Sequence, residues 1–274
     1  MRVRWTCLVC RPYPCGSKKK QRERYSSRVR GEFEHREVVA RLEKFGVLTR
    51  RKLQPPAALA IGAASRMLEP GARRAGVFTK SPLASEIVAN YARGWVLLGL
   101  SFKGIHGLEW HRFPRRGVIT RETAHVPGRM REVQRREKLE VRFDEDFEEI
   151  VQNCREGRSG WLSDETVSAY RSVHDLGFSA TVGTYRDGRL VGGMWGITVG
   201  RCFGIMSMFH LEDHAGSLAL TAVTEQLIAG NRWSMVDCVL LTDHFKRFGA
   251  HEISTEAFCE SIWRSMPPAR APES

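Results

Sequence analysis

The stretch that decides the fold is residues 189–210, RLVGGMWGITVGRCFGIMSMFH. Two apolar runs rich in β-branched and aromatic residues flank Val199-Gly200-Arg201, and this pattern predicts a buried antiparallel hairpin. Glycine is unusual inside a strand, because it leaves a gap in the packed surface. Such gaps suit a β-bulge, the approach of a ligand to the backbone, or simply a hairpin loosened by glycine. The glycines concerned are Gly192, Gly193, Gly196 and Gly204.

Strand and helix patterns alternate on both sides of this hairpin. Asp187-Gly188 is a strong two-residue turn signal immediately before it. Ser163 and Ser254 are candidate N-caps of amphipathic helices. The expected elements are strands at 139–144, 179–190 and 235–241 and helices at 144–154, 163–177, 214–229, 242–248 and 254–263.

With the hairpin included, the elements up to the helix at 242–248 follow the order strand-helix-helix-strand-strand-strand-helix-strand-helix. This is the order of an N-acetyltransferase-like α/β domain, a mixed sheet flanked by helices, which we expect over residues 139–264. Such a sheet offers a cleft where its central strands diverge, and the cleft suits an ester donor and an amine acceptor. Because many functions share one fold, the topology alone supports acyl transfer only by analogy.

The N-terminal part of the chain is strongly basic. Residues 1–80 hold 20 Lys and Arg against 6 Asp and Glu, a net charge of +14, so the other 194 residues carry −2 of the total of +12. This composition predicts a basic, disordered arm. Cys7, Cys10 and Cys15 are spaced irregularly for a zinc knuckle. With seven cysteines, no export signal and no apolar run near the ~20 residues of a membrane helix, we expect a soluble cytoplasmic protein with free thiols.

A small N-terminal subdomain is expected over residues 81–138, and a loose tail over residues 265–274. Ser81 and Pro82 are candidates for the N-cap and first position of a helix that Gly94 would end. The apolar face of this helix would be formed by Leu83, Ile87, Val88 and Tyr91.

Residues 126–138 predict a basic helix inside this subdomain. The surrounding stretch, residues 112–142, holds ten Lys and Arg against four Asp and Glu. Arg131 and Arg135 are four positions apart and therefore share one face of the helix. The stripe is either a phosphate-contacting surface or a solvated face partly neutralised by neighbouring glutamates.

A series of short motifs is spaced along the second half of the chain. They read Trp161-Leu-Ser, Ala169-Tyr170, His174-x-Leu-Gly177, Leu190-Val-Gly-Gly-Met194-x-Gly196, Ser207-Met208-Phe209, Asp237-Cys238 and Phe248-Gly-Ala250-x-Glu-Ile253. At these intervals they resemble the leucyl/phenylalanyl-tRNA–protein transferases, the bacterial N-end-rule enzymes. The resemblance covers about Ser81 to Trp263 and rests on the series as a whole.

The resemblance implies transfer of Leu, Phe or Met from aminoacyl-tRNA to the α-amine of proteins that begin with Arg or Lys, which tags them for degradation. The ester donor is already activated, so no cofactor and no metal is implied. An α-amine has a pKa near ~7.7–8, and an appreciable fraction is free base at neutral pH. The site therefore mainly positions the two partners and stabilises the oxyanion. We expect a monomer without a membrane partner.

The resemblance also implies roles for individual residues. An aspartate at Asp237, with a nearby glutamine, would activate the amine; Trp161 would stack on the terminal adenine, and an apolar pocket would include Met194 and Phe203. A structural carboxylate and ordinary core packing are the alternatives. The implied residues are catalytic Asp237, substrate-binding Trp161, Met194, Phe203, Ser207, Met208 and Phe209, and tRNA-binding Arg131, Arg135 and Arg136.

The chain departs from the family pattern at positions that carry the mechanism. Met206 stands where the family has a glutamate, and Val239 where it has a glutamine. Neither side chain accepts or relays a proton, and loss of one such group commonly costs ~10²–10⁴ in rate. His210 and His244 are candidate substitutes, although a lone histidine is more often structural. Further departures are Val96-Leu97-Leu98 for Phe-Pro-Trp, and Ala215-Gly216-Ser217 without the family's lysine.

Three functions therefore stay open. The first is the aminoacyl-tRNA–protein transferase, and the second is a weak or inactive homologue that binds tRNA or protein N-termini. The third is an acyltransferase of this fold with another donor. The sequence lacks an Arg/Gln-x-x-Gly-x-Gly/Ala pyrophosphate loop, which counts against acetyl-coenzyme A.

Overall fold

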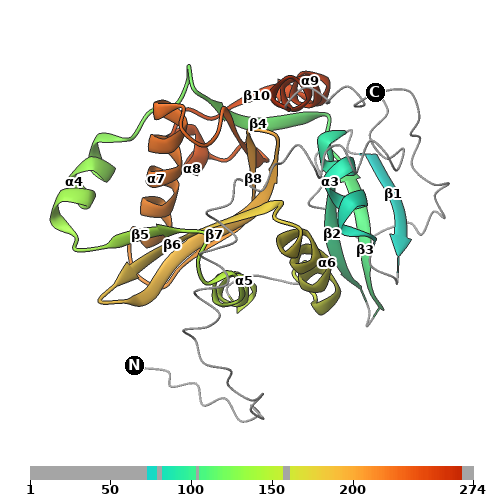
Figure 1. The fold of residues 1–274 in the computed structure, drawn as a ribbon, viewed down its shortest axis with the longest axis horizontal. Helices are drawn as coiled ribbons and strands as arrows, with labels where there is room; N and C mark the ends of the chain where they lie inside the picture. The colour runs from blue at the N-terminus through green and yellow to red at the C-terminus, as the bar shows by residue number, and fades with distance from the viewer. Residues whose placement is uncertain (1–72, 79–81, 103–104, 157–160, 267–274) are drawn as a thin grey trace, which may run out of the picture. The chain divides into compact units, whose positions relative to one another are not determined.

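The computed structural model describes residues 73–78, 82–102, 105–156 and 161–266, all within one compact unit, Leu42–Pro268 (Figure 1). The cysteines considered for a zinc knuckle and most of the predicted basic arm lie outside these residues. Across the described ranges, none of the helices has both the length and the apolar character needed to cross a bilayer.

A seven-stranded mixed sheet has the strand order β10-β4-β9-β8-β7-β6-β5. Its neighbouring strands are antiparallel except for β8 and β9, which run parallel. The strands are β4 (Arg115–Thr120), β5 (Glu140–Phe143), β6 (Ser179–Arg186), β7 (Arg189–Val199), β8 (Cys202–His210), β9 (Met235–Val239) and β10 (His251–Ser254).

Helices cover both faces of this sheet (Figure 1). Trp195 of β7 packs edge-on against Phe147 of α5 and Tyr170 of α6. Its neighbour Met194 points to the opposite face and joins the core beneath α7. The predicted fold class, a mixed α/β sheet flanked by helices in the expected order, is therefore confirmed. The helices are α5 (Phe147–Glu156), α6 (Asp164–Asp175), α7 (Ala215–Ala229), α8 (Asp243–Lys246) and α9 (Thr255–Ser265).

The predicted hairpin is formed by β7 and β8, and both turns around it form where the sequence placed them. Asp187 and Gly188 have φ values of 51° and 76°, which is the left-handed pair that a tight hairpin turn needs. Gly200, with φ 58°, begins the turn between β7 and β8. The caps at Ser163 and Ser254 are also confirmed, because their hydroxyls accept from the backbone N–H groups of Thr166 and Ala257.

A second sheet has the order β1-β3-β2. Its strands are β1 (Arg73–Phe78), β2 (Trp95–Phe102) and β3 (Ile105–Arg112), and α3 (Ala84–Ala92) and α6 pack beside it. The sequence predicted none of these strands. β1 lies within residues 1–80, so the expected disorder of that arm is wrong for Arg73–Phe78. β2 and β3 were missed because Gly99, Gly104 and Gly107 suggested a loop. Gly99 is needed for close packing, since a Cβ there would lie 2.1 Å from the carbonyl oxygen of Trp161.

The predicted start of the first helix is wrong. The helix α3 begins at Ala84 with Leu83 as its N-cap, so Pro82 is not its first residue. Leu83 is 68% exposed rather than part of the apolar face, because it precedes the helix. Gly94 follows the helix with φ 83°, as predicted. The domain boundaries stay predictions; β4, from the expected small subdomain, pairs with β9 and β10 in the larger sheet.

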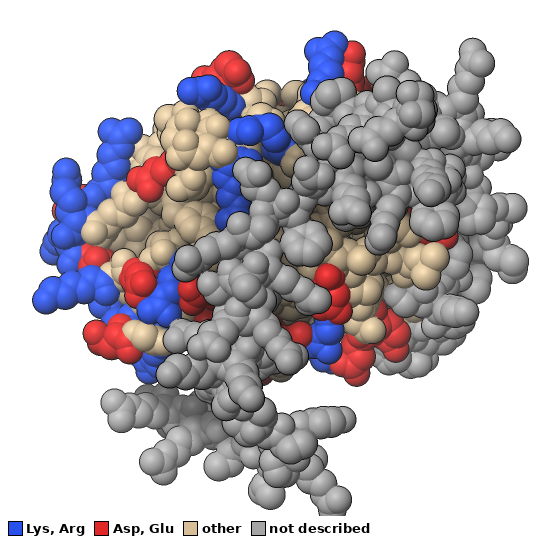
Figure 2. Space-filling view, in the orientation of Figure 1, with Lys and Arg blue, Asp and Glu red and all other residues tan. Residues whose placement is uncertain are grey.

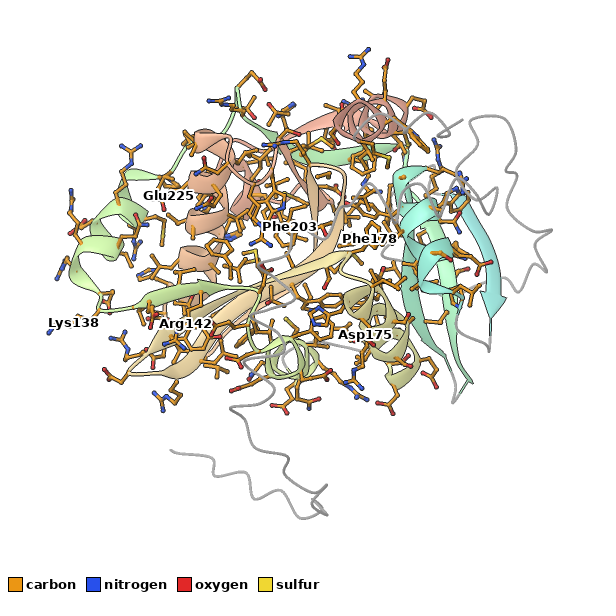
Figure 3. The ribbon with its side chains drawn as sticks, viewed as in Figure 1. Lys138, Arg142, Asp175, Phe178, Phe203 and Glu225 are labelled. Carbon is orange, nitrogen blue, oxygen red and sulfur yellow. The ribbon has the colours of Figure 1, made fainter. Side chains whose placement is uncertain are left out.

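The predicted basic helix is α4 (Gly128–Arg136), which packs against α7. Gln134 of α4 donates to Glu225 of α7 at 3.1 Å, and Glu225 faces α4 in Figure 3. Figure 2 shows basic side chains gathered at the edge where α4 lies. The exposed arginines of α4 are Arg129, Arg131, Arg135 and Arg136.

Candidate functional site

The central parallel strands β8 and β9 pair over a short distance and then separate. Their paired positions run from Cys202 opposite Met235 to Gly204 opposite Asp237. Strand β8 continues to His210 without β9 beside it. We call the region beyond Gly204 and Asp237 the β8–β9 split. It is where the sequence predicts the donor and acceptor to meet.

Met206 is the extra residue of a β-bulge at the split. On β7 the neighbours Trp195 and Gly196 pair with Ser207 and Ile205, so Met206 has no partner of its own. A bulge bends its strand and redirects the side chain it carries. Met206, which stands where the family pattern has a glutamate, therefore lies outside the regular pairing of β7 with β8.

Val239 lies at a second irregularity, on the β9 side of the split. Gly117 and Val118 of β4 pair with Val239 and Asp237, which leaves Cys238 as the extra residue. Val239 has φ 61°, a left-handed conformation that is a true outlier for a β-branched residue. The chain then turns sharply over β4, where a Cβ at Gly117 would lie 2.8 Å from the backbone nitrogen of Leu241.

Asp237 is completely buried, and both of its carboxylate oxygens are used twice. Oδ1 accepts from Nε of Arg116 at 3.2 Å and from the backbone N–H of Val239 at 2.9 Å. Oδ2 accepts from the hydroxyl of Tyr91 at 2.6 Å and from Nη2 of Arg116. Arg116 also donates to the carbonyl of Gly94 at 3.2 Å. The hydrogen-bond donors to Asp237 are therefore the side chains of Arg116 and Tyr91 and one backbone amide, that of Val239.

Burial and charge fix the protonation of the groups around Asp237. Burial raises the pKa of the Tyr91 hydroxyl well above its ordinary value, and Asp237 raises it further, so Tyr91 stays a donor. Burial alone would lower the pKa of Arg116, but Asp237 and Tyr91 raise it above its ordinary value. Burial also raises the pKa values of the Cys202 and Cys238 thiols, which remain protonated.

The spaces left by the hairpin glycines are taken by the protein itself. A Cβ at Gly204 would lie 1.9 Å from the Tyr91 hydroxyl, and one at Gly192 would lie 2.5 Å from Cβ of Ala215. At Gly193 and Gly196 the obstacles are backbone carbonyls of neighbouring strands. The expectation that a ligand approaches the backbone at these glycines is therefore wrong, whereas the expected bulge is present between Trp195 and Gly196.

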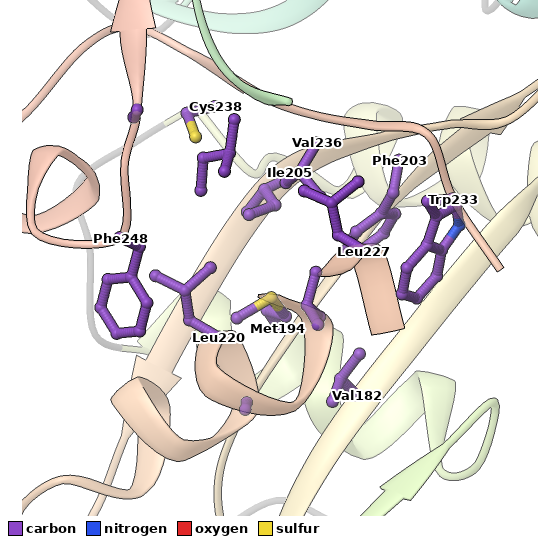
Figure 4. Close-up of a cluster of buried hydrophobic side chains, with 14 of the residues drawn as sticks. Val182, Met194, Phe203, Ile205, Leu220, Leu227, Trp233, Val236, Cys238 and Phe248 are labelled. Atoms are coloured by element: carbon purple, nitrogen blue, oxygen red, sulfur yellow. The ribbon is translucent and has the colours of Figure 1, made fainter. Parts of the chain in front are cut away.

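The two residues expected to line an amino-acid pocket lie in the packed core. Met194 and Phe203 have no exposed surface, and Phe203 stacks on Trp233 with ring centroids 4.9 Å apart (Figure 4). Met208, also expected at the substrate, packs against the same cluster. A pocket role for these residues stays a prediction, and it requires this core to open.

The other predicted substrate contacts face the opposite side of the sheet. Trp161 is half-buried, and its ring stacks on Trp195 with centroids 6.4 Å apart. Ser207 and Phe209 alternate with Met208 along β8 and are buried. The hydroxyl of Ser207 and the indole nitrogen of Trp195 are buried without a hydrogen-bond partner among the described residues.

Of the two histidine candidates, His244 is half-buried, and its Nδ1 already accepts a hydrogen bond. Nη2 of Arg247 donates to its Nδ1 at 2.8 Å, so a neutral ring carries its proton on Nε2. Burial lowers the pKa of His244, and Arg247 and His210 lower it further. Nε2 is buried without a partner in the described part of the chain. His244 thus offers a donor, while His210 is exposed.

The arginines of α4 differ in their partners. Arg136 pairs with Glu132 at 3.1 Å, whereas Arg131 and Arg135 form no ion pair with any described residue. Two exposed arginines four positions apart fit the spacing of a phosphate-contacting face.

Sequence reasoning missed Arg116, which was counted only as part of a basic stretch. A lone carboxylate inside an apolar strand needs a charged or hydrogen-bonding partner, and that requirement was the available signal. Tyr91 was expected in the core but not as a hydrogen-bond donor to Asp237.

Comparison with known proteins agrees with the resemblance seen in the sequence. The family model described as leucyl/phenylalanyl-tRNA protein transferase matches residues 118–262. A protein of that name from Azoarcus sp. (strain BH72) is 32% identical over 81% of this chain and 93% of its own length. Another from Dechloromonas aromatica (strain RCB) is 34% identical over 54% of this chain and 65% of its own length.

Among solved structures, L-PGS from Bacillus licheniformis is similar over 60% of this chain and 51% of its own, with 12% identity and a TM-score of 0.32. The family match and the relatives carry the assignment. The chain belongs to the leucyl/phenylalanyl-tRNA–protein transferase family.

Proposed function

We propose that this protein transfers Leu, Phe or Met from aminoacyl-tRNA to the α-amine of proteins that begin with Arg or Lys. The reaction would take place in the cytoplasm, where aminoacyl-tRNA is found, and would mark the acceptor for degradation. The amine nitrogen attacks the ester carbonyl, the bond to the ribose oxygen breaks, and the amine proton ends on that oxygen. The protein has to align the two partners and stabilise the oxyanion.

The observation that supports this most is the pair of backbone irregularities at the split. Met206 and Val239 each lie two positions beyond the last paired residues, Gly204 and Asp237. One lies on a bulge and the other has a left-handed backbone. Such features concentrate at functional sites. These irregularities support a functional site at the two positions where the family pattern has a glutamate and a glutamine, and where this chain has Met206 and Val239.

Because Met206 and Val239 cannot relay a proton, we expect slow transfer. Loss of groups of this type costs ~10²–10⁴ in rate each, and the remaining rate comes from alignment. For tRNA, we propose contacts from Arg131, Arg135 and Arg136 of α4 and stacking of the terminal adenine on Trp161, which is worth ~1–3 kcal/mol per base. The alternative is a homologue that binds tRNA or protein N-termini without transfer.

The deciding experiment incubates the full chain with labelled Leu-, Phe- or Met-tRNA and a protein beginning with Arg. Transfer above background supports the proposal, and tRNA binding without transfer supports the alternative. The double variant Met206→Glu with Val239→Gln should raise the rate if only those two groups are missing. Leu176→Glu with Ile228→Gln adds the same groups at exposed positions and should leave the rate unchanged.

A further inference from the structure

Asp237 has no hydrogen-bonding capacity left for a substrate. An ionised carboxylate offers about four lone-pair positions. Arg116 fills two of them, and Tyr91 and the backbone N–H of Val239 fill the others. The side chains of Asp237 and Arg116 both have zero exposed surface. The accepting atom of a base must come within about 2.6–3.2 Å of the atom that carries the proton, and Asp237 offers neither a free lone pair nor access.

The same hydrogen bonds show what Asp237 does hold. Its Oδ1 accepts from the backbone of Val239, the residue with φ 61°. That conformation is costly for a β-branched residue and persists only where its surroundings enforce it. Immediately before Val239, the extra residue Cys238 shifts β9 against β4, and the pairing of β9 with β8 has ended. Through this hydrogen bond, the Asp237 carboxylate holds the backbone of Val239 at the β8–β9 split.

Arg116 holds the Asp237 carboxylate in this position. Its guanidinium makes a two-point contact with the carboxylate, and Phe258 lies 4.3 Å beneath it. A buried carboxylate without a counter-charge would be strongly unfavourable. The positive charge that neutralises Asp237 thus comes from Arg116 of β4.

We propose that Arg116 and Asp237 are positioning residues, which hold the Val239 backbone and so keep β8 and β9 apart, and that the attacking amine loses its proton without Asp237. The proposal rests on the proposed function. In the reaction the nitrogen–carbon bond forms, the carbon–oxygen bond to the ribose breaks, and the proton is carried by solvent to the departing hydroxyl. The pH dependence then follows the α-amine of the acceptor.

Two neutral double variants separate positioning from the other roles of Asp237. Arg116→Met with Asp237→Asn keeps an oxygen for the Val239 N–H but cannot take up the amine proton. Arg116→Met with Asp237→Leu removes that oxygen as well. Neither variant leaves a buried charge unpaired, in contrast to the single changes. Arg116→Gln with Asp237→Asn is a second neutral pair should the first not fold.

We expect the asparagine variant to keep transfer within about tenfold of the parent, with the same pH profile. The leucine variant, folded by circular dichroism, should lose about 100-fold or more, because small misalignments cost rates of that size. Loss of transfer in both folded variants would overturn the proposal in favour of a chemical role for Asp237. Retention in both would overturn it in favour of a merely structural ion pair.

A second measurement keeps this test separate from the proposed function. Amide hydrogen exchange at Val239 should be slow in the parent and in the asparagine variant, and fast in the leucine variant. If the parent protein transfers nothing, the proposed function fails. The exchange pattern still decides whether Asp237 holds the backbone of Val239. Equal rates of amide exchange at Val239 in the asparagine and leucine variants would show that Asp237 does not hold this backbone.

Discussion

Val239 adopts a backbone conformation that suits glycine better than valine. A left-handed conformation costs an L-residue about 1–2 kcal/mol. Val239→Gly should therefore raise the free energy of unfolding by about 1 kcal/mol, measured by urea denaturation. The matched control is Val141→Gly on β5, which is half-buried and has no positive φ. It should lower the free energy of unfolding by about 1 kcal/mol. Equal losses in both variants would contradict the strain at Val239.

Gly204 makes room for the hydroxyl that reaches Asp237. A Cβ at this position would lie 1.9 Å from the Tyr91 oxygen, which cannot retreat without losing its hydrogen bond. Gly204→Ala should therefore lower the free energy of unfolding by about 1–3 kcal/mol, as overpacking does. Gly128→Ala is the control, since a Cβ there meets nothing within 4 Å, and it should change stability by less than about 0.5 kcal/mol. Thermal unfolding of the two variants provides the comparison.

At the scale of elements, α4 is the part of the protein proposed to meet the tRNA backbone. Arg131→Ala with Arg135→Ala should weaken tRNA binding and reduce the slope of log affinity against log salt by about 1 per lost phosphate contact. The control, Arg155→Ala with Arg171→Ala, removes two arginines that pair with carboxylates on α5 and α6. Filter binding at several salt concentrations measures both. An unchanged slope in the α4 variant would exclude it from the tRNA interface.

Elements with caps, turns and a clear period were predictable from the sequence, and strands without such local signals were not. The hairpin, α5, α6 and α7 each carry local signals within their own residues. By contrast, β4 opens with two arginines and a glycine, and β10 has four residues. Their strand character depends on pairing with each other across a long stretch of sequence, which no local pattern reveals.

The candidate site also has features that the sequence predicts and features that it cannot predict. Positions Asp237, Met206 and Val239 were found through the resemblance, and the structure brings them to one split between strands. The sequence could not reveal that Asp237 is already held, because Arg116 lies 121 positions away from it. Nor could it show that Met194 packs inside the core, since an apolar residue in a strand serves equally for core and pocket.

For the whole molecule, several buried groups stay protonated in alkaline solution. Burial raises the pKa values of Cys202, Cys238 and Tyr91 in the folded state. The stabilising contribution of each group is complete below its own ordinary pKa and is lost as the pH rises above that value, because the unfolded chain then releases a proton that the folded chain keeps. The free energy of unfolding should fall above about pH 9 because of the two thiols, and above about pH 10 because of Tyr91 as well, by up to ~1.4 kcal/mol per pH unit for each group.

Urea unfolding at pH 8 and pH 10 measures this dependence. In Cys238→Ala the free energy of unfolding should decrease less between pH 8 and pH 10, by the contribution of one thiol. The variant is also less stable at both pH values, because the substitution leaves a small cavity. A free energy of unfolding that stays level between the two pH values would show that these groups ionise equally in both states.

The order in which the polypeptide is made gives the ion pair between β4 and β9 one more consequence. The ribosome delivers Arg116 ahead of Asp237, by 121 residues, so this arginine has no carboxylate partner from β9 while the intervening chain is synthesised. The central sheet cannot close until β9 and β10 have been released, so its closure waits for the synthesis of both strands. A stalled or shortened product would carry an open strand edge beside an unmatched cation, which is the kind of nascent species that chaperones retain and proteases remove.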